Sequence, residues 1–393
     1  MPVAKKIKDF IERASWIREM FEAGIRLRAE VGDKNIYDFS LGNPDLEPPA
    51  EFKTVLRELV EDPTPGTHMY MPNAGFPEVR RQVADFAGQE YGLGFTADDI
   101  IMTVGAGAAL NVALKTVLDP GDEVIVPRPY FMEYNFYVDN HNGVIKIADT
   151  NPDFSLNLDK IAAEATDKTR AVLINSPNNP TGAVYPEENL RDLSRLLEDM
   201  SAKAGRPVIL ISDEPYRKIV YDGVTVPSVF AHYQYVVCAT SYSKDLSLAG
   251  ERIGFLAVHP EVPEKGALLG GLVLNNRILG YVNAPALMQR VVGRLQGRSV
   301  DISIYKKRRD MFVQGLREAG YELNVPQGAF YLFPRSPIED DVAFVRELQK
   351  ENILAVPGAG FGSPGFFRLS YSVPDVVIEK SIPGFKRVLE SVS

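Results

Sequence analysis

From residue 99 onward, short apolar runs alternate with segments whose apolar residues recur at helical spacing. The seven runs are Ile100–Val104, Val124–Val126, Val144–Ile147, Ala171–Ile174, Val208–Ile211, Val236–Ala239 and Ile253–Val258. Helical patterns lie between several of them, at 106–118, 132–139, 158–164 and 186–203. This alternation predicts an α/β fold with a mostly parallel seven-stranded sheet covered by helices on both faces. Because ligands of such sheets bind outside the carboxyl ends of the strands, we expect the chemistry to follow the apolar runs.

The rest of the chain lacks this regular alternation of predicted strands and helices. Helices are expected at 1–35, 50–61 and 77–91, with a strand that begins at Tyr37. After residue 285, two long helical patterns (284–297 and 299–319) lead into short alternating stretches at 321–325, 329–333, 353–356 and 366–371, and a last helix covers 374–391. We therefore expect a large domain at 48–285 and a smaller α+β domain at 286–393, which the segment 1–47 joins.

Composition and charge narrow the class of protein. The chain has 393 residues and a formal net charge of −9, which argues against nucleic acid or an anionic membrane as a partner. A single cysteine, Cys238, excludes a disulfide within the chain and favours a cytoplasmic location. No stretch reads as a signal peptide or a membrane span, and the four scattered histidines argue against a histidine metal site.

Several segments after the runs carry candidate chemistry. The small residues from Gly105 to Leu110 open a helix, whose bare N–H groups suit a phosphate, although they could simply pack a helix on a strand. Tyr130 or Phe131 could lie over a flat ring or belong to the core. The turn from Asn175 to Gly182 is rich in asparagine and proline and would aim an amide in a set direction.

Four charged residues complete the set. Asp213 ends an apolar run, where a carboxylate is costly unless it meets a cation or hydrogen-bond donors. Lys244 follows Ser241-Tyr-Ser243, and Arg252 precedes the next run; taken alone, this lysine could face water beside a turn. Arg368 lies in an apolar stretch and either pairs with a structural acid or awaits a carboxylate ligand.

Together these residues fit the chemistry of pyridoxal phosphate. A lysine amine forms a Schiff base with the aldehyde of this cofactor, and an acid keeps its pyridine nitrogen protonated. Helix N–H groups, serines and an arginine can hold the phosphate, while a second arginine can hold a substrate carboxylate in a fork. The sequence therefore predicts a pyridoxal-phosphate enzyme.

At this point the chain resembles the class I/II aminotransferases, which are pyridoxal-phosphate enzymes of fold type I in the aspartate aminotransferase superfamily. The resemblance covers nearly the whole chain. Its motifs occur in the family's order: Gly42-Asn-Pro, Tyr70-x-Pro-x-x-Gly75, Gly105-Ala-Gly, Pro127-x-Pro, Asn179-Pro-Thr-Gly182, Asp213-Glu-Pro-Tyr216, Ser241-x-Ser-Lys244, Arg252 and Arg368. The resemblance implies the transfer of an amino group from an L-amino acid to a 2-oxo acid by a ping-pong route through an aldimine of Lys244.

The resemblance also implies roles for single residues. Lys244 would move a proton during the reaction, Asp213 would face the pyridine nitrogen, and Tyr216 with Asn179 would donate to the phenolic oxygen of the ring. Phe131 would stack on that ring. The phosphate would be bound by the Ala106 and Gly107 amides, Ser241, Ser243 and Arg252.

Substrate and partner roles follow in the same way. Arg368 would grip the substrate α-carboxylate with help from the Gly42 backbone and Asn179. Tyr70 would reach the phosphate of the neighbouring subunit, which implies a homodimer with shared active sites. Dicarboxylate-specific relatives place a second arginine on the distal carboxylate. Arg277 lies near that place but one residue off, and a solvated surface position fits it better.

Two other functions compete with aminotransfer. A carbon–sulfur lyase of the same fold shares every motif above and differs only after deprotonation at Cα. The aminotransferase-like sensor half of certain transcription regulators is the non-enzymatic alternative. It requires a basic DNA-binding domain in front of the fold, and the forty residues before Gly42-Asn-Pro are too few for one.

Overall fold

The computed structural model describes residues 2–13, 24–30, 32 and 35–392. The chain divides into two units. The larger comprises residues 43–306 and 325–330, and the smaller comprises the described parts of 1–42, 307–324 and 331–393. The larger unit extends past the expected boundary at residue 285, because helix α10 (Ala286–Arg294) packs against α3 (Ala50–Glu61) and α4 (Pro77–Tyr91) of the same unit.

The larger unit is built on a seven-stranded sheet with the order β2-β8-β7-β6-β5-β3-β4. Its strands are β2 (Ile100–Thr103), β3 (Glu123–Arg128), β4 (Val144–Asp149), β5 (Thr169–Asn175), β6 (Ile209–Asp213), β7 (Val236–Ser241) and β8 (Gly254–Val258). Of these strands, β8 alone runs antiparallel to its neighbours, so the mostly parallel sheet predicted from the apolar runs is confirmed. The carboxyl ends of the six parallel strands and the amino end of β8 therefore share one edge.

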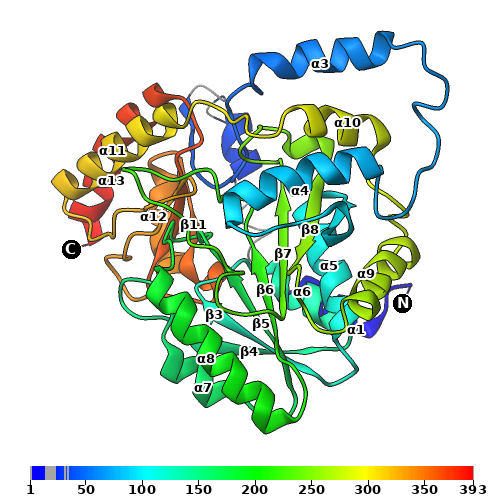
Figure 1. The fold of residues 1–393 in the computed structure, drawn as a ribbon. Helices are drawn as coiled ribbons and strands as arrows, with labels where there is room; N and C mark the ends of the chain where they lie inside the picture. Colours follow the sequence, from blue (N-terminus) through cyan, green and yellow to red (C-terminus); the bar gives the residue numbers. More distant parts are fainter. Residues whose placement is uncertain (1, 14–23, 31, 33–34, 393) are drawn as a thin grey trace. The chain divides into compact units, whose positions relative to one another are not determined.

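Helices cover both faces of this sheet, as predicted (Figure 1). Successive strand residues point to opposite faces. In β5, Val172 and Ile174 join the core shared with α4, α7, α8 and α10, while Ala171 and Leu173 join the core shared with α5, α6 and α9. These helices are α5 (Gly105–Val117), α6 (Glu133–Asp139), α7 (Leu158–Glu164), α8 (Glu187–Ala204) and α9 (Lys265–Ile278), together with α4 and α10.

Local sequence signals explain both ends of α4. Pro77 occupies the first turn of α4, where its missing N–H costs no hydrogen bond, and Gly92 caps the other end with φ of +71°.

Helix α9 has no counterpart among the predicted helices, because three glycines weaken its pattern. One of them, Gly271, lets α9 approach α5: a β-carbon there would lie 2.8 Å from Cγ2 of Thr116.

The smaller unit combines helices with short strands, in agreement with the predicted α+β pattern. Strand β1 (Tyr37–Asp38) pairs in parallel with β10 (Ile353–Leu354), and an antiparallel group follows the order β11-β12-β9. These strands are β11 (Val356–Pro357), β12 (Phe367–Ser370) and β9 (Tyr331–Leu332). Its helices are α1 (Lys5–Arg13), α11 (Ile302–Ala319, from residue 307 on), α12 (Asp341–Lys350) and α13 (Asp375–Val392).

The smaller unit differs from the sequence expectations in three details, of which the first is helix α12, a segment with no counterpart among the predicted helices. The stretch 321–325 forms no strand, because Tyr321 is instead anchored in the core, where its hydroxyl donates to Phe385 O over 2.9 Å. The predicted helix over 1–35 is helical at 5–13 and 24–30, and its middle lies outside the described residues. In the described part of the chain, no helix has both the length and the apolar composition to cross a membrane.

Candidate active site

The predicted site residues of the larger unit gather at the shared edge of the sheet. Phe131 follows β3, Asn179 follows β5, Asp213 ends β6, and Lys244 follows β7. Arg252 precedes β8, whose antiparallel direction brings its amino end to the same edge. The strand order thus collects groups that are up to 121 residues apart in the sequence.

Asp213 has one carboxylate oxygen engaged and one without a partner. The side chain is buried, and Tyr134 on α6 donates its hydroxyl to Oδ2 over 2.6 Å. Among the described residues, Oδ1 of Asp213 makes no hydrogen bond. Burial raises the pKa of this carboxyl to about 7, against the opposing effect of the Tyr134 hydrogen bond. A buried acceptor of this kind calls for a donor that the chain does not supply.

The Asn175–Gly182 turn is held by its own amides. Asn175 donates from Nδ2 to Asp213 O (2.8 Å) and accepts from the backbone N–H of Asn179 (2.7 Å), which ties the turn to the end of β6. Asn178 accepts from the hydroxyl and N–H of Thr181. Gly182 has φ of +68°, and a β-carbon there would lie 2.4 Å from Cβ of Pro326, so only glycine fits.

An arginine lies against the start of α5. Gly105 begins this helix with φ of +76°, and a β-carbon on it would be 2.7 Å from Nη2 of Arg252. Arg252 itself has φ of +52° and donates from Nη1 to Ala249 O over 3.0 Å. Ser241 and Ser243, both buried, lie on β7 and just beyond it. First-turn N–H groups, hydroxyls and a guanidinium are the kinds of group that bind a dianion.

Lys244 lies among aromatic rings. Its Nζ is 5.5 Å from the ring centroid of Phe330 and 5.8 Å from that of Tyr216. Tyr216 is buried and meets Phe330 edge to face, with the centroids 5.4 Å apart. Phe330 enters this group from the segment 325–330, which belongs to the larger unit although it lies far along the chain. The lysine amine therefore lies beside apolar ring surface.

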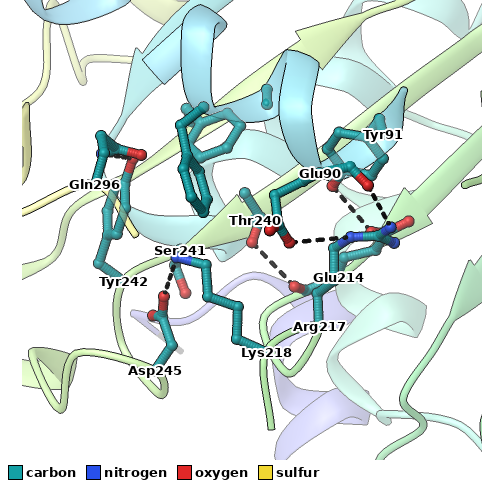
Figure 2. A pocket seen from close by; sticks show the side chains of 13 residues that line it. Glu90, Tyr91, Glu214, Arg217, Lys218, Thr240, Ser241, Tyr242, Asp245 and Gln296 are labelled. Atoms are coloured by element: carbon teal, nitrogen blue, oxygen red, sulfur yellow. Dashed lines mark hydrogen bonds and ion pairs between the residues drawn. The ribbon is translucent and has the colours of Figure 1, made fainter. Parts of the chain in front are cut away.

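A buried charged cluster lies beside a cavity of about 40 Å³ (Figure 2). Its Tyr91 belongs to the core on one face of the sheet, and Tyr134 belongs to the core on the other face. Glu214 follows Asp213 and so points the other way, where it accepts from Tyr91 (2.9 Å), Ser212 (2.8 Å) and Arg217 (3.0 Å). Burial raises the pKa of the Tyr91 hydroxyl well above its usual range. A second ion pair joins Lys218 Nζ to Asp245 across 2.9 Å.

The smaller unit holds Arg368 and Gly42 around one tyrosine. Arg368 is buried and donates from Nη2 to Ser40 O over 2.6 Å, while its guanidinium lies 4.6 Å from the ring centroid of Tyr331. A β-carbon on Gly42 would collide with the Tyr331 hydroxyl, at 1.9 Å. The backbone at Gly42 therefore stays close to the same ring that supports Arg368.

Two predicted residues lie on exposed surface. The side chain of Tyr70 is 87% exposed, beside Met69 at 69%. Arg277 is exposed on α9. The roles expected for both residues, on a partner's phosphate and on a distal carboxylate, stay predictions.

Sequence reasoning missed three residues that shape the site. Tyr134 and Asn175 occur after β3 and at the end of β5, but nothing in the pattern distinguishes them from core or turn residues. Tyr331 lies in a two-residue buried strand, and its sequence gives no sign that Tyr331 would contact Arg368. The described residues contain no group of three or more histidine, cysteine, aspartate or glutamate side chains able to hold a metal ion.

Comparison with known proteins gives the family. Residues 34–382 match the model of the family described as aminotransferase class I and II. The chain is 30% identical over 388 residues to a probable aspartate aminotransferase of Methanocaldococcus jannaschii, covering 96% of this chain and 98% of the relative. It is also 30% identical over 393 residues to aromatic-amino-acid aminotransferase 2 of Thermococcus litoralis, covering 96% of each.

A solved structure agrees with the sequence matches. The crystal structure of an aminotransferase from Eubacterium rectale has a TM-score of 0.96 and 40% identity, covering 100% of this chain and 99% of that one. The predicted fold and the transaminase activity are confirmed by these matches, which give no support to the lyase alternative. The chain belongs to the class I and II aminotransferases.

Proposed function

We propose that this aminotransferase works with pyridoxal phosphate held at the strand-end edge of the larger unit. The observation that carries the proposal is Oδ1 of Asp213, a buried acceptor without a partner among the described residues. The protonated pyridine nitrogen of the cofactor is a donor that would satisfy it. Lys244 and the dianion site at Gly105 and Arg252 supply the other two groups that the cofactor needs.

In the proposed reaction, the side chains around the cofactor ring bind the ring and move protons. When bound, the cofactor supplies an aldehyde that condenses with amines and a ring that withdraws electrons from the substrate Cα. Lys244 holds a proton at Nζ and moves it to and from that Cα. Asp213 keeps the ring nitrogen protonated, and Tyr216 with Asn179 donates to the ring's phenolic oxygen. Phe131 covers one face of the ring.

The phosphate would be held at the start of α5. The groups proposed for it are the Ala106 and Gly107 amides, Ser241, Ser243 and Arg252. Ala106 and Gly107, in the first turn of α5, are partly exposed, and the positive end of the helix dipole favours an anion there. The approach of Arg252 to Gly105 adds a fixed positive charge.

The substrate is an amino acid or a 2-oxo acid, and we propose Arg368 as the group that binds its α-carboxylate, with Gly42 and Asn179. One of the two relatives described above is named for aspartate and the other for aromatic amino acids, and both are 30% identical to this chain. Sequence identity therefore does not indicate which substrate side chain this protein prefers. Rates measured with a panel of amino donors that includes aspartate, tyrosine and alanine would identify the preferred side chain. A distal-carboxylate role for Arg277 requires a preference for aspartate.

We also propose a homodimer in which Tyr70 completes the partner's site, in a cytoplasmic protein. The exposed Tyr70 and Met69 form an apolar surface of the kind that a second subunit covers. Mixed dimers of Lys244→Ala and Tyr70→Phe chains would test this directly. One of their two sites keeps both residues, so activity should return on mixing; no return of activity contradicts shared sites.

The function itself is tested by following the amino group. The protein, loaded with pyridoxal phosphate, is incubated with a ¹⁵N-labelled amino acid and 2-oxoglutarate. Aminotransfer predicts ¹⁵N-glutamate and one equivalent of the donor's 2-oxo acid. Pyruvate and free ammonia without labelled glutamate would instead support the lyase.

A further inference from the structure

We propose that Tyr134 is a positioning residue for the cofactor, because its hydroxyl orients the Asp213 carboxylate so that Oδ1 faces the ring nitrogen. This inference rests on the proposed cofactor. It assigns a role to a residue of α6 that the motifs found in the sequence do not include.

The contact between Tyr134 and Asp213 is short and enclosed. The hydroxyl oxygen lies 2.6 Å from Oδ2, the distance typical of an O–H donor to a charged oxygen. The Tyr134 side chain is 1% exposed and Asp213 is 6% exposed. Tyr134 is the one side-chain donor to this carboxylate among the described residues, and its bond to Oδ2 fixes the rotation that leaves Oδ1 for a ligand.

The tyrosine ring is itself held in place by two aromatic neighbours. Tyr130 stacks on Tyr134 with centroids 6.4 Å apart and planes at 13°. Phe131 meets it edge to face at 5.7 Å and 86°. Because Phe131 is the residue proposed to cover the cofactor ring, Tyr134 links the groups proposed for the face of that ring and for its nitrogen.

The Tyr134 hydroxyl keeps the proton that it donates. Burial, and then the Asp213 charge, raises the pKa of the Tyr134 hydroxyl well above its usual range, so the hydroxyl keeps its proton. Its hydrogen bond opposes the effect of burial on Asp213 and so favours the carboxylate over the acid. The other titratable groups that act on this pair are Glu214 on β6, Cys238 on β7, Tyr137 on α6 and Tyr185.

The first test measures cofactor affinity. The full chain is freed of cofactor and titrated with pyridoxal phosphate by tryptophan and tyrosine fluorescence, as wild type and as Tyr134→Phe, which removes one oxygen. We expect affinity at pH 7 to fall about 10- to 100-fold, the value of a hydrogen bond to a charged group. In the Asp213→Asn background, the same change should alter affinity less than about threefold, because the charge it supports is gone.

The second test needs no cofactor. A raised pKa in the folded state means that the folded protein binds a proton that the unfolded chain has lost, so stability falls as pH rises from about 4 to about 7. In Tyr134→Phe that fall should continue about 1–2 pH units higher, because the pKa of Asp213 rises further without its donor. The melting temperatures of the cofactor-free wild type and variant, measured between pH 4 and 9, would show this shift.

Tyr233→Phe is the matched control. Tyr233 is a buried tyrosine of the same unit whose hydroxyl donates to Val208 O over 2.7 Å, and its loss should leave affinity and the pH window unchanged. Three results would each overturn the inference. The first is equal cofactor affinity for wild type and Tyr134→Phe, and the second is an equal loss of affinity when Tyr134→Phe is made in the Asp213→Asn background. The third is a Tyr134→Phe chain that fails to fold where Tyr233→Phe folds. Failure of the wild type to bind pyridoxal phosphate would instead overturn the proposed function, while the pH window would still test the Tyr134–Asp213 contact.

Discussion

Replacing Arg217 by methionine removes the cation that neutralises Glu214 behind the site (Figure 2). The Arg217 guanidinium donates to Glu214 over 3.0 Å and lies 4.2 Å from the ring centroid of Tyr91. Glu214 is 1% exposed, so it stays out of reach of water after the change. Only the hydroxyls of Tyr91 and Ser212 remain as its donors among the described side chains.

The size of the effect follows from the burial of the carboxylate. Removing one partner of a buried ion pair costs about 3–5 kcal/mol, since the other charge is left uncompensated. Unfolding the roughly 270 residues of the larger unit carries an entropy of about 0.6 kcal/mol per degree. The melting temperature of Arg217→Met should therefore fall by about 5–9 °C. Glu214→Gln combined with Arg217→Met removes both charges and should recover more than half of that loss.

Differential scanning calorimetry of the cofactor-free protein at about pH 7.5 measures both variants against wild type. A fall of less than about 2 °C for Arg217→Met would refute the reasoning, because the ion pair would then contribute little. A double variant no more stable than Arg217→Met would refute it as well, since the cost would come from lost packing on Tyr91 and not from the unpaired charge.

Three further predictions concern other parts of the chain. Arg368→Ala should lower kcat/KM for amino acids about 30- to 1000-fold, mainly through KM, with cofactor affinity unchanged; unfolding of the variant would favour a structural role. Gly182→Ala should destabilise the protein by more than Gly205→Ala, which has a similar positive φ but open space around it, and equal losses of melting temperature would contradict the collision with Pro326. Lys244→Ala should abolish turnover and keep the fold, as circular dichroism would show; retained turnover contradicts its role.

The sheet could be predicted because its strands carry their own signal. The run Ala171–Ile174 is apolar at every position, as a strand covered on both faces requires, and β5 indeed contributes to two cores. The placement of Asp213 and Lys244 at one edge followed from the same runs, since parallel strands end together. The family motifs added Arg368, which no strand pattern would have assigned.

What the sequence left open depends on contacts between distant residues. Tyr134 and Asp213 are 79 residues apart, and their hydrogen bond depends on the packing of α6 against α5 and β4 at the edge where β6 ends. Glu214 and Tyr91, 123 residues apart, are joined by the approach of α4 to the other face of the sheet. Helix α9 escaped prediction because three glycines weaken its helical pattern, and close packing on α5 accounts for one of them, Gly271.

The central claim is that Lys244 is the residue that carries pyridoxal phosphate. Reduction of the cofactor-loaded protein with sodium borohydride fixes the cofactor on the lysine that holds it, and peptide mass spectrometry then locates it. We predict that the peptide containing Lys244 gains the mass of one pyridoxyl phosphate group, and that prior addition of an amino-acid donor prevents the gain. Label on a different lysine, or no label in a protein that still transfers amino groups, would contradict the account.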